Sequence, residues 1–284
     1  MRLCIPKSTK IFCEFKNILL PKCDETSYIN YMKNKPVLIV DSGIGGLSIL
    51  YLMQKNIKNC DYIYFADSKN APFGNKSISD LRKECIDNLK FLIKKYTPQT
   101  IIFACNTLTA TTIYQARKVF DIPIIGTEPA IKIALQKNKK KILLLATQNT
   151  IKHNRNLQNY LDSENVITKT CTNLATMIEQ NINNLDKLQL YIKKELNPFL
   201  SKIDAIVLGC THYIFLRPLL KRICPTSIEI IDGNLGVVRQ AQKLILCNKP
   251  GKISIYTNTP NERKILTSAW EILQTQGGKI CVES

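Results

Sequence analysis

The strongest constraint on the fold is a repeated alternation of short apolar runs with longer amphipathic runs, which begins at Val37. The apolar runs have strand length and are rich in Ile, Leu and Val, and most are followed by a helical pattern. This alternation predicts parallel strands joined by right-handed helical crossovers. The expected strands are Val37–Val40, Tyr62–Ala66, Ile101–Ala104, Ile122–Gly126, Ile142–Ala146, Val166–Thr170, Ala205–Leu208 and Ile228–Ile231.

Two landmarks recur at one spacing along the chain. The runs that start at Val37 and Ile142 are 105 residues apart, and so are Cys105 and Cys210. The repeat predicts an α/β fold of two similar parallel-sheet domains related by pseudo-twofold symmetry, with the active site in the cleft between them. We expect residues 36–129 plus 233–284 to form the first domain and residues 130–232 the second.

Residues 1–35 do not share this pattern. They hold seven basic and three acidic residues, and they lack the apolar core and cleavage site of a secretory signal. We interpret them as an N-terminal extension that is either flexible or an overlong start, with Met32 as the alternative translation start.

The net charge of +18 does not by itself indicate a nucleic-acid-binding protein. Lysines are scattered along the chain, and the densest cluster, Lys137 to Lys141, contains no aromatic residue. A dedicated nucleic-acid site needs a motif and a basic stripe, so we do not expect one. No apolar run approaches the roughly 20 residues that cross a bilayer, so we expect no membrane association.

The eleven cysteines show no CxxC spacing, and only two histidines accompany them, so we expect no zinc site. Their odd number and the lack of a signal predict reduced thiols in a cytoplasmic protein. Only Cys105 and Cys210 lie between a predicted strand and a polar turn that leads into a helix. The N–H groups and the positive dipole end of a helix start favour a thiolate at such a position.

Polar residues near these two cysteines suggest proton transfer. Asp41 and Ser42 end the first strand, and His212 shares a turn with Cys210, so carboxylate and imidazole partners are available. Glu179 is a further candidate to adjust the protonation of the thiols. Side chains near both helix starts, together with backbone N–H groups, form a cradle for a carboxylate, and they are Asn106, Thr107 and Thr211.

The glycine-rich turn at Gly43, Gly45 and Gly46 does not follow the dinucleotide pattern G-x-G-x-x-G. We interpret it as a tight turn that brings backbone close to a ligand. No lysine stands out as an anchor for pyridoxal phosphate either, so we expect no cofactor.

An ordered series of motifs resembles the glutamate racemase family over nearly all of residues 36–284. The motifs are Asp41-Ser-Gly-Ile-Gly-Gly-Leu, Asp67 with Pro72-Phe-Gly, Ala104-Cys-Asn-Thr, Gly126-Thr-Glu-Pro-Ala-Ile-Lys and Gly209-Cys-Thr-His-Tyr. The resemblance implies an enzyme that interconverts L- and D-glutamate without a cofactor and supplies D-glutamate for peptidoglycan. One cysteine thiolate would remove the α-proton, and the other thiol would protonate the opposite face.

The resemblance also implies roles for individual residues. Cys105 would act on D-glutamate with help from Asp41, and Cys210 on L-glutamate with His212. Glu179 matches the third acid of the family's site. The substrate-binding residues implied by the family are Asp41, Ser42, Phe73, Gly74, Asn106, Thr107, Thr150, Thr211 and His212.

Two positions depart from the family pattern: Phe73 replaces the usual tyrosine, and Asp232-Gly-Asn-Leu-Gly replaces Asp-Ser-Gly. The N-terminal extension and the C-terminal tail resemble the enterobacterial-type, activator-dependent branch of the family. That branch uses UDP-N-acetylmuramoyl-L-alanine as an allosteric activator, and the resemblance places its contacts at Arg117, Gly126 and Lys132.

Other functions stay open from the sequence. Aspartate racemases also carry two cysteines, but they typically have glutamate where His212 stands. A non-catalytic protein that binds an acidic amino acid would use the same cleft, and a secondary gyrase or nucleic-acid role could coexist with catalysis. If the protein were a hydrolase with a cysteine nucleophile, the second thiol would have no function. The oligomeric state is left open between monomer and homodimer.

Overall fold

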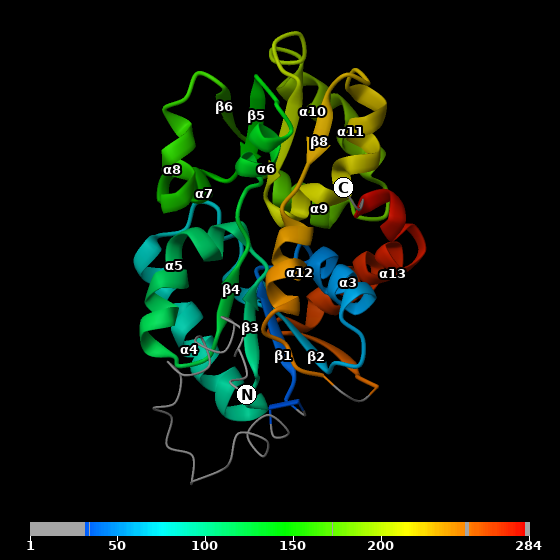
Figure 1. Ribbon diagram of the computed structural model, residues 1–284. Coiled ribbons are helices and arrows are strands. Elements are labelled where there is room, and N and C mark those ends of the chain that lie inside the picture. Colours follow the sequence, from blue (N-terminus) through cyan, green and yellow to red (C-terminus); the bar gives the residue numbers. More distant parts are fainter. Residues whose placement is uncertain (1–31, 34, 172, 248–249, 282–284) are drawn as a thin grey trace, which may run out of the picture.

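The computed structural model describes residues 32–281 except 34, 172 and 248–249, so our interpretation of residues 1–31 lies outside the described chain. Two parallel sheets form the framework (Figure 1). The first has the order β4-β3-β1-β2-β9, and the second has the order β6-β5-β7-β8. The strands are β1 (Val37–Asp41), β2 (Tyr62–Ala66), β3 (Thr100–Phe103), β4 (Ile124–Gly126), β5 (Ile142–Ala146), β6 (Val166–Thr170), β7 (Ala205–Gly209), β8 (Glu229–Ile231) and β9 (Ile253–Thr257).

The repeat read from the sequence is present in the topology. The order β4-β3-β1-β2 in the first sheet matches β8-β7-β5-β6 in the second. Three matched pairs of strands begin 105 residues apart, and the fourth pair, β2 and β6, begins 104 apart. The predicted α/β fold with two parallel sheets is therefore confirmed.

The predicted domain boundaries fall where the chain passes between the sheets. Residues 127–141 lead from β4 to β5, and residues 232–252 lead from β8 back to β9. The division into domains at these points stays a prediction; below, the first and second domains mean the parts of the chain that carry the first and second sheets.

Helices cover the sheets, and each strand is followed along the chain by an α-helix or a 3-10 helix (Figure 1). The α-helices are α3 (Leu47–Asn56), α4 (Ile78–Tyr96), α5 (Asn106–Val119), α6 (Ile131–Gln136), α7 (Gln148–His153), α8 (Arg155–Leu161), α9 (Leu174–Gln180), α10 (Gln189–Leu196), α11 (Arg217–Ile223), α12 (Asn234–Gln242) and α13 (Arg263–Ile280). Short 3-10 helices are η1 (Ser68–Asn70), η2 (Leu185–Leu188), η3 (Thr211–Leu216) and η4 (Pro260–Glu262).

Two helices start at the cysteines that the sequence analysis singled out. Helix α5 begins at Asn106, with Cys105 at its N-cap position. The 3-10 helix η3 begins directly after Cys210 and leads into α11. In both places the cysteine therefore lies at a helix start.

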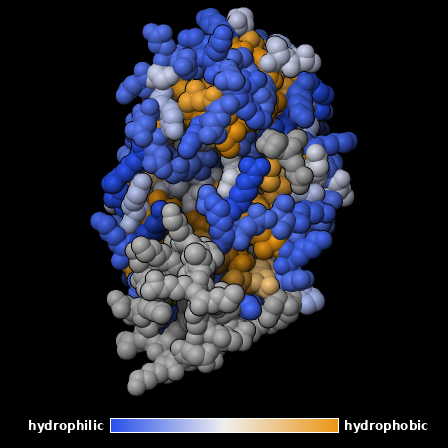
Figure 2. Space-filling view, viewed as in Figure 1, coloured by the Kyte–Doolittle hydropathy of each residue, from blue (hydrophilic) through white to orange (hydrophobic). Residues whose placement is uncertain are grey.

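The central strands are buried on both faces, as is usual for parallel sheets under helices. Every residue of β1, β2, β5 and β7 is buried. Figure 2 shows hydrophilic residues over most of the visible face, with hydrophobic residues showing through in patches. In the described part of the chain, no helix is both long and apolar enough to cross a membrane.

Cys60 and Cys247 form a disulfide that ties the residues before β2 to the segment after α12. Their Cα atoms are 5.1 Å apart, within the usual range for a disulfide. The expectation that all cysteines are reduced is therefore wrong for this pair. Within the described residues, the other six cysteines are free and buried.

Replacing Leu144 with alanine tests the core of the second sheet. Leu144 is fully buried in β5, so the substitution should lower the free energy of unfolding by about 2–5 kcal/mol. Leu190→Ala is the matched control, because that side chain is 81% exposed and should change stability by less than about 0.5 kcal/mol. Urea denaturation followed by circular dichroism measures both; equal effects would contradict the assigned core.

Candidate active site

A cavity of about 260 Å³ lies at the carboxyl ends of strands from both sheets. Cys105, which follows β3, and Cys210, which follows β7, both line it. The same edge of an open α/β sheet is the usual place for a ligand. The repeat thus brings its two thiols to one enclosed space.

Cys105 is buried and lies with its Sγ 3.9 Å from the Ser42 hydroxyl. Burial raises the pKa of its thiol well above the usual range, and the negative charge of Asp41 raises it further. The N–H of Leu108 at the helix start acts in the opposite direction but does not prevail. The helix-start N–H therefore favours the thiolate, as expected, but desolvation outweighs it and the pKa of the Cys105 thiol is raised.

Cys210 has a different partner, the imidazole of His212. His212 Nδ1 lies 4.0 Å from the Cys210 Sγ, and its Nε2 lies 2.9 Å from Glu179 Oε1. Burial lowers the pKa of His212, but its contacts with Cys210 and Glu179 raise it by more, so the pKa ends well above 6.5. These contacts favour the protonated imidazole, which lies between the Cys210 sulfur and the Glu179 carboxylate.

The pKa of Glu179 is shifted in the direction opposite to that of His212. Burial raises the pKa of its carboxyl, but the hydrogen bond and charge of His212 lower it by more, so the pKa ends below its ordinary value. The Ile44 N–H also donates to Glu179 Oε1 at 3.2 Å. Glu179 and His212 consequently form an ion pair that reaches the turn after β1.

Asp41 is buried behind the cavity wall and does not line the cavity itself. Its Oδ2 accepts hydrogen bonds from Gly46 N at 2.8 Å and from Tyr64 OH at 3.1 Å. Burial raises the pKa of Asp41, while the His212 charge and these hydrogen bonds lower it by less. Its Oδ1 has no partner within the described residues, so one carboxylate oxygen can accept a proton or a hydrogen bond.

The turn at Gly43 and Gly45 packs directly on the pair from the other half of the molecule. A Cβ on Gly43 would collide with Glu179 Oε1, and one on Gly45 would lie 2.6 Å from both His212 Nδ1 and Thr211 Oγ1. Only glycine allows this approach. The turn brings backbone close to Glu179 and His212, and its expected closeness to a ligand stays a prediction.

Three threonines join the two halves on another side of the cavity. Thr107 Oγ1 lies 2.7 Å from Thr147 Oγ1 and 3.3 Å from Thr150 Oγ1. Thr107 and Thr147 line the cavity, whereas Thr150 is buried behind them. Thr150 therefore supports the wall.

The predicted substrate-binding residues fall into two groups. Five of the nine line the cavity, and these are Ser42, Phe73, Gly74, Thr107 and His212. The other four lie behind its wall, and these are Asp41, Asn106, Thr150 and Thr211. Asn106 donates to the Thr127 carbonyl at 3.3 Å, so in this state it orders the segment after β4.

Sequence reasoning missed further cavity residues, among them Cys171 and Glu262. Cys171 directly follows β6 and precedes α9, so the expectation that only Cys105 and Cys210 lie between a strand and a helix is wrong. Glu262 comes from η4 near the C-terminus and has no local motif. The structure shows no group of three or more His, Cys, Asp or Glu side chains suited to a metal ion in the part of the chain that it describes.

The predicted activator contacts lie outside the cavity. Arg117 donates from Nε and Nη2 to the Ile124 carbonyl, at 3.1 and 2.6 Å. Gly126 ends β4, and Lys132 is exposed on α6. None of the three lines the cavity that holds the thiols.

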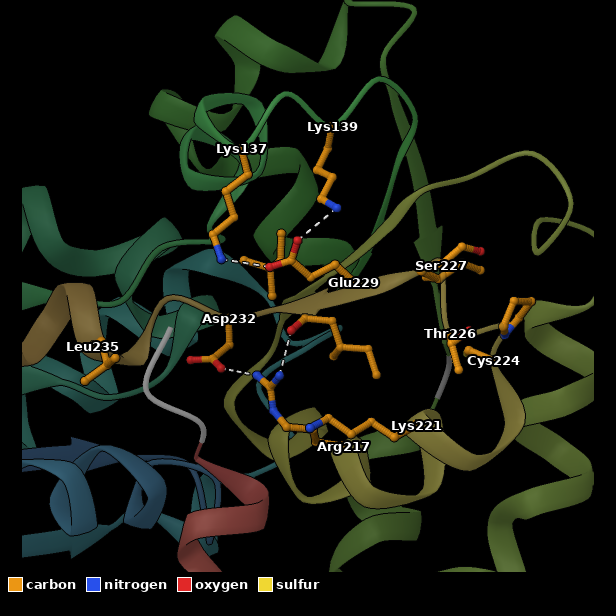
Figure 3. Close-up of a pocket in the computed structure, with 14 residues that line it drawn as sticks. Lys137, Lys139, Arg217, Lys221, Cys224, Thr226, Ser227, Glu229, Asp232 and Leu235 are labelled. Atoms are coloured by element: carbon orange, nitrogen blue, oxygen red, sulfur yellow. Dashed lines mark hydrogen bonds and ion pairs between the residues drawn. The ribbon is translucent and has the colours of Figure 1, made fainter.

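A larger hollow of about 630 Å³ lies beside β8 and contains neither thiol (Figure 3). Lys137 and Lys139 both bind Glu229, at 2.7 and 2.9 Å, and Arg217 pairs with Asp232. Its size does not make it the reaction site, because neither Cys105 nor Cys210 lines it. Four cations line it against two carboxylates, so it favours an anion.

The chain resembles known racemases in sequence. The pattern of the family described as Asp/Glu/Hydantoin racemase matches residues 48–241. Glutamate racemase from Clostridium novyi is 36% identical over 251 residues, which cover 84% of this chain and 96% of that protein. Glutamate racemases from Clostridium kluyveri, Clostridium perfringens and Clostridium botulinum also match, at 32%, 34% and 34% identity, and the predicted enterobacterial-type branch is not confirmed.

Solved structures share the fold. Glutamate racemase isoform RacE1 from Bacillus anthracis matches with a TM-score of 0.74 at 25% identity, over 87% of this chain and 95% of that one. Escherichia coli glutamate racemase, solved with L-glutamate and the activator UDP-MurNAc-Ala, matches with a TM-score of 0.73 at 24% identity, over 85% and 95%. The second likeness shows the fold alone.

Replacing Glu179 with glutamine tests the ion pair. Because the pKa of His212 is raised in the fold, its protonation stabilises the fold below pH 6.5, and this stabilisation is lost as pH rises through the folded pKa. The neutral amide should lower the pKa of His212, since burial then acts with less opposition. NMR titration of the imidazoles measures this, with the His153 signal as internal control; an unchanged His212 titration would contradict the pair.

Proposed function

Because this chain belongs to the Asp/Glu/Hydantoin racemase family, and within it to the glutamate racemases, we propose that it interconverts L- and D-glutamate through the two thiols of the cavity. The chain is an amino-acid racemase. The observation that carries the two-thiol proposal is the placement of Cys105 and Cys210 on the wall of one cavity, each at a helix start in its own half of the repeat.

Inversion at the α-carbon needs an acid and a base on opposite faces. One sulfur, as thiolate, takes the α-proton, and the electron pair left on Cα delocalises into the adjacent carboxylate. The other sulfur, as thiol, gives its proton to the opposite face and becomes the thiolate. Proton count and charge balance, and the enzyme returns to its starting state when the thiols exchange protons with solvent.

Different side chains lie beside the two thiols, and this difference fits a reaction in which one sulfur acts as base and the other as acid. In the L to D direction, Cys210 removes the proton beside His212, and Cys105 donates as the thiol that burial favours. In the reverse direction, Cys105 must lose its proton, and the free oxygen of Asp41 is the acceptor that its surroundings offer. Glu179 holds His212 in place in both directions.

No Lys or Arg is among the described residues that line the cavity, so apart from His212 the donors available to the substrate's carboxylates are neutral. The hydroxyls of Ser42 and Thr107 and the backbone at Phe73 and Gly74 offer such donors. Loss of the tyrosine hydroxyl at Phe73 does not affect a backbone contact. Supply of D-glutamate for peptidoglycan in the cytoplasm follows from the family as part of the same proposal.

For the activator, we propose the hollow beside β8 as the binding site for UDP-N-acetylmuramoyl-L-alanine. Figure 3 shows Lys137 and Lys139 both pointing at one carboxylate, Glu229, which leaves an excess of positive charge for a diphosphate. The hollow reaches Asp232, where the chain crosses back to the first sheet, so a ligand there can affect the position of the two halves. The protein from Escherichia coli was solved with this activator.

Single cysteine variants test the two-thiol reaction. Cys105→Ala and Cys210→Ala should each lower racemisation of glutamate by at least about 10³-fold, because each removes one acid–base group. Cys85→Ala is the control, since this buried cysteine of α4 lies outside the cavity. Circular dichroism follows the loss of optical activity of L-glutamate, D-glutamate and L-aspartate.

Three results would overturn this proposal. Near wild-type activity in either cavity variant would remove that thiol from the reaction. Racemisation of aspartate but not glutamate would establish the aspartate racemase alternative. Binding of glutamate without racemisation or exchange of its α-proton would establish a binding protein.

A double variant, Lys137→Ala with Lys139→Ala, tests the activator site. The activator concentration that gives half the effect should rise about tenfold or more, because the diphosphate loses two cations and meets an unpaired Glu229. Lys94→Ala, an exposed lysine of α4, is the control. An effect in Arg117→Ala alone would place the ligand at the contacts implied by the family resemblance, and no activation of the parent protein would refute activator dependence.

A further inference from the structure

The loop of residues 68–76 carries Phe73 and Gly74 into the wall of the cavity. Its start is fixed within the first domain by the buried carboxylate of Asp67. This carboxylate accepts hydrogen bonds from the side-chain amides of three asparagines at 2.6 to 3.1 Å, and they are Asn70, Asn88 and Asn258. These residues come from η1, from α4 and from the residue after β9, so one end of the loop is tied to three elements of the same domain.

The other end of the loop is held by a residue of the second domain, Asn149. Its side-chain Nδ2 donates to the carbonyls of Phe73 and Lys76, at 3.0 and 2.9 Å. Its backbone N–H donates to the carbonyl of Gly74 at 3.1 Å. Asn149 is only 7% exposed and lies in the first turn of α7, which packs against α5 (Figure 1).

These bonds fix the orientation of two peptide groups. In a trans peptide the N–H points opposite to the C=O. Since the carbonyls of Phe73 and Gly74 point at Asn149, the N–H groups of Gly74 and Asn75 point away from it. Within the described residues neither N–H donates to another backbone or side-chain group, and both Gly74 and Asn75 line the cavity.

We propose that Asn149 is a positioning residue for catalysis: it locks the loop so that the N–H groups of Gly74 and Asn75 face the substrate's carboxylate. The inference rests on the proposed racemase function for its substrate. It goes beyond it by coupling the position of the second domain to the binding surface of the first. The cavity then has its full set of donors only when α7 is docked on the loop.

Asparagine has the shape and the donors that this position requires. Its amide reaches two carbonyls with two N–H groups, and the adjacent backbone N–H reaches a third. Aspartate has the same shape but would set oxygens against the carbonyls of Phe73 and Lys76. Alanine would keep the backbone bond and lose both side-chain bonds.

The test compares the parent protein with Asn149→Ala, Asn149→Asp and Asn149→Gln. Asn56→Ala is the matched control, because its amide bonds only to the Leu52 carbonyl within α3. We expect KM for both enantiomers to rise about tenfold or more in the Ala and Asp variants, with kcat changed by less than about threefold. Glutamine, which keeps the amide, should recover part of the loss and serves as the variant least disturbing to folding.

Hydrogen–deuterium exchange gives a second readout that does not depend on turnover. D-Glutamate should protect the amides of residues 74 and 75 in the parent protein and in Asn56→Ala, and this protection should be lost in Asn149→Ala and Asn149→Asp. An unchanged KM, or unchanged protection in folded variants, would overturn the positioning role. Protection without racemisation in the parent protein would refute the proposed function and leave this inference standing.

Discussion

The close approach of the turn after β1 to the Glu179–His212 ion pair is the contact on which the rest of the site depends. The turn belongs to the first sheet and the pair to the second half, and glycines at 43 and 45 leave no space between them. The Ile44 N–H bonds to Glu179, and the turn's own N–H groups bond to Asp41. This contact therefore contributes to the relative position of the two halves and sets the surroundings of both proton partners.

The consequence is an enclosed site whose two thiols are chemically unequal. Burial and the charge of Asp41 raise the pKa of the Cys105 thiol, whereas Cys210 lies beside His212, whose own pKa is raised by its contacts. In water such differences would be screened, but burial strengthens each charge's effect on its neighbours. The repeat in the chain supplies two similar positions, and the residues around them supply the asymmetry that a thiol–thiolate pair needs.

Much of the fold could be predicted from the sequence, because buried parallel strands appear in it as apolar runs. The 105-residue spacing of Cys105 and Cys210 indicated the repeat. The raised pKa of Cys105 could not be predicted, since it depends on how completely the folded chain buries the thiol. The disulfide of Cys60 and Cys247, 187 residues apart, carries no spacing signal. The role of Asn149 carries no sequence signal either, because it arises only where α7 meets a loop from the other half of the molecule.

The most direct test of the central claim is the early course of the reaction of L-glutamate in D₂O, followed by mass spectrometry of both enantiomers. Two thiols on opposite faces predict that each new D-glutamate carries one deuterium at Cα, because its hydrogen comes from a solvent-exchanged thiol. The remaining L-glutamate should stay unlabelled at first. D-Glutamate that retains the original hydrogen, or label that enters both enantiomers at one rate from the start, would show a single acid–base group and contradict the account.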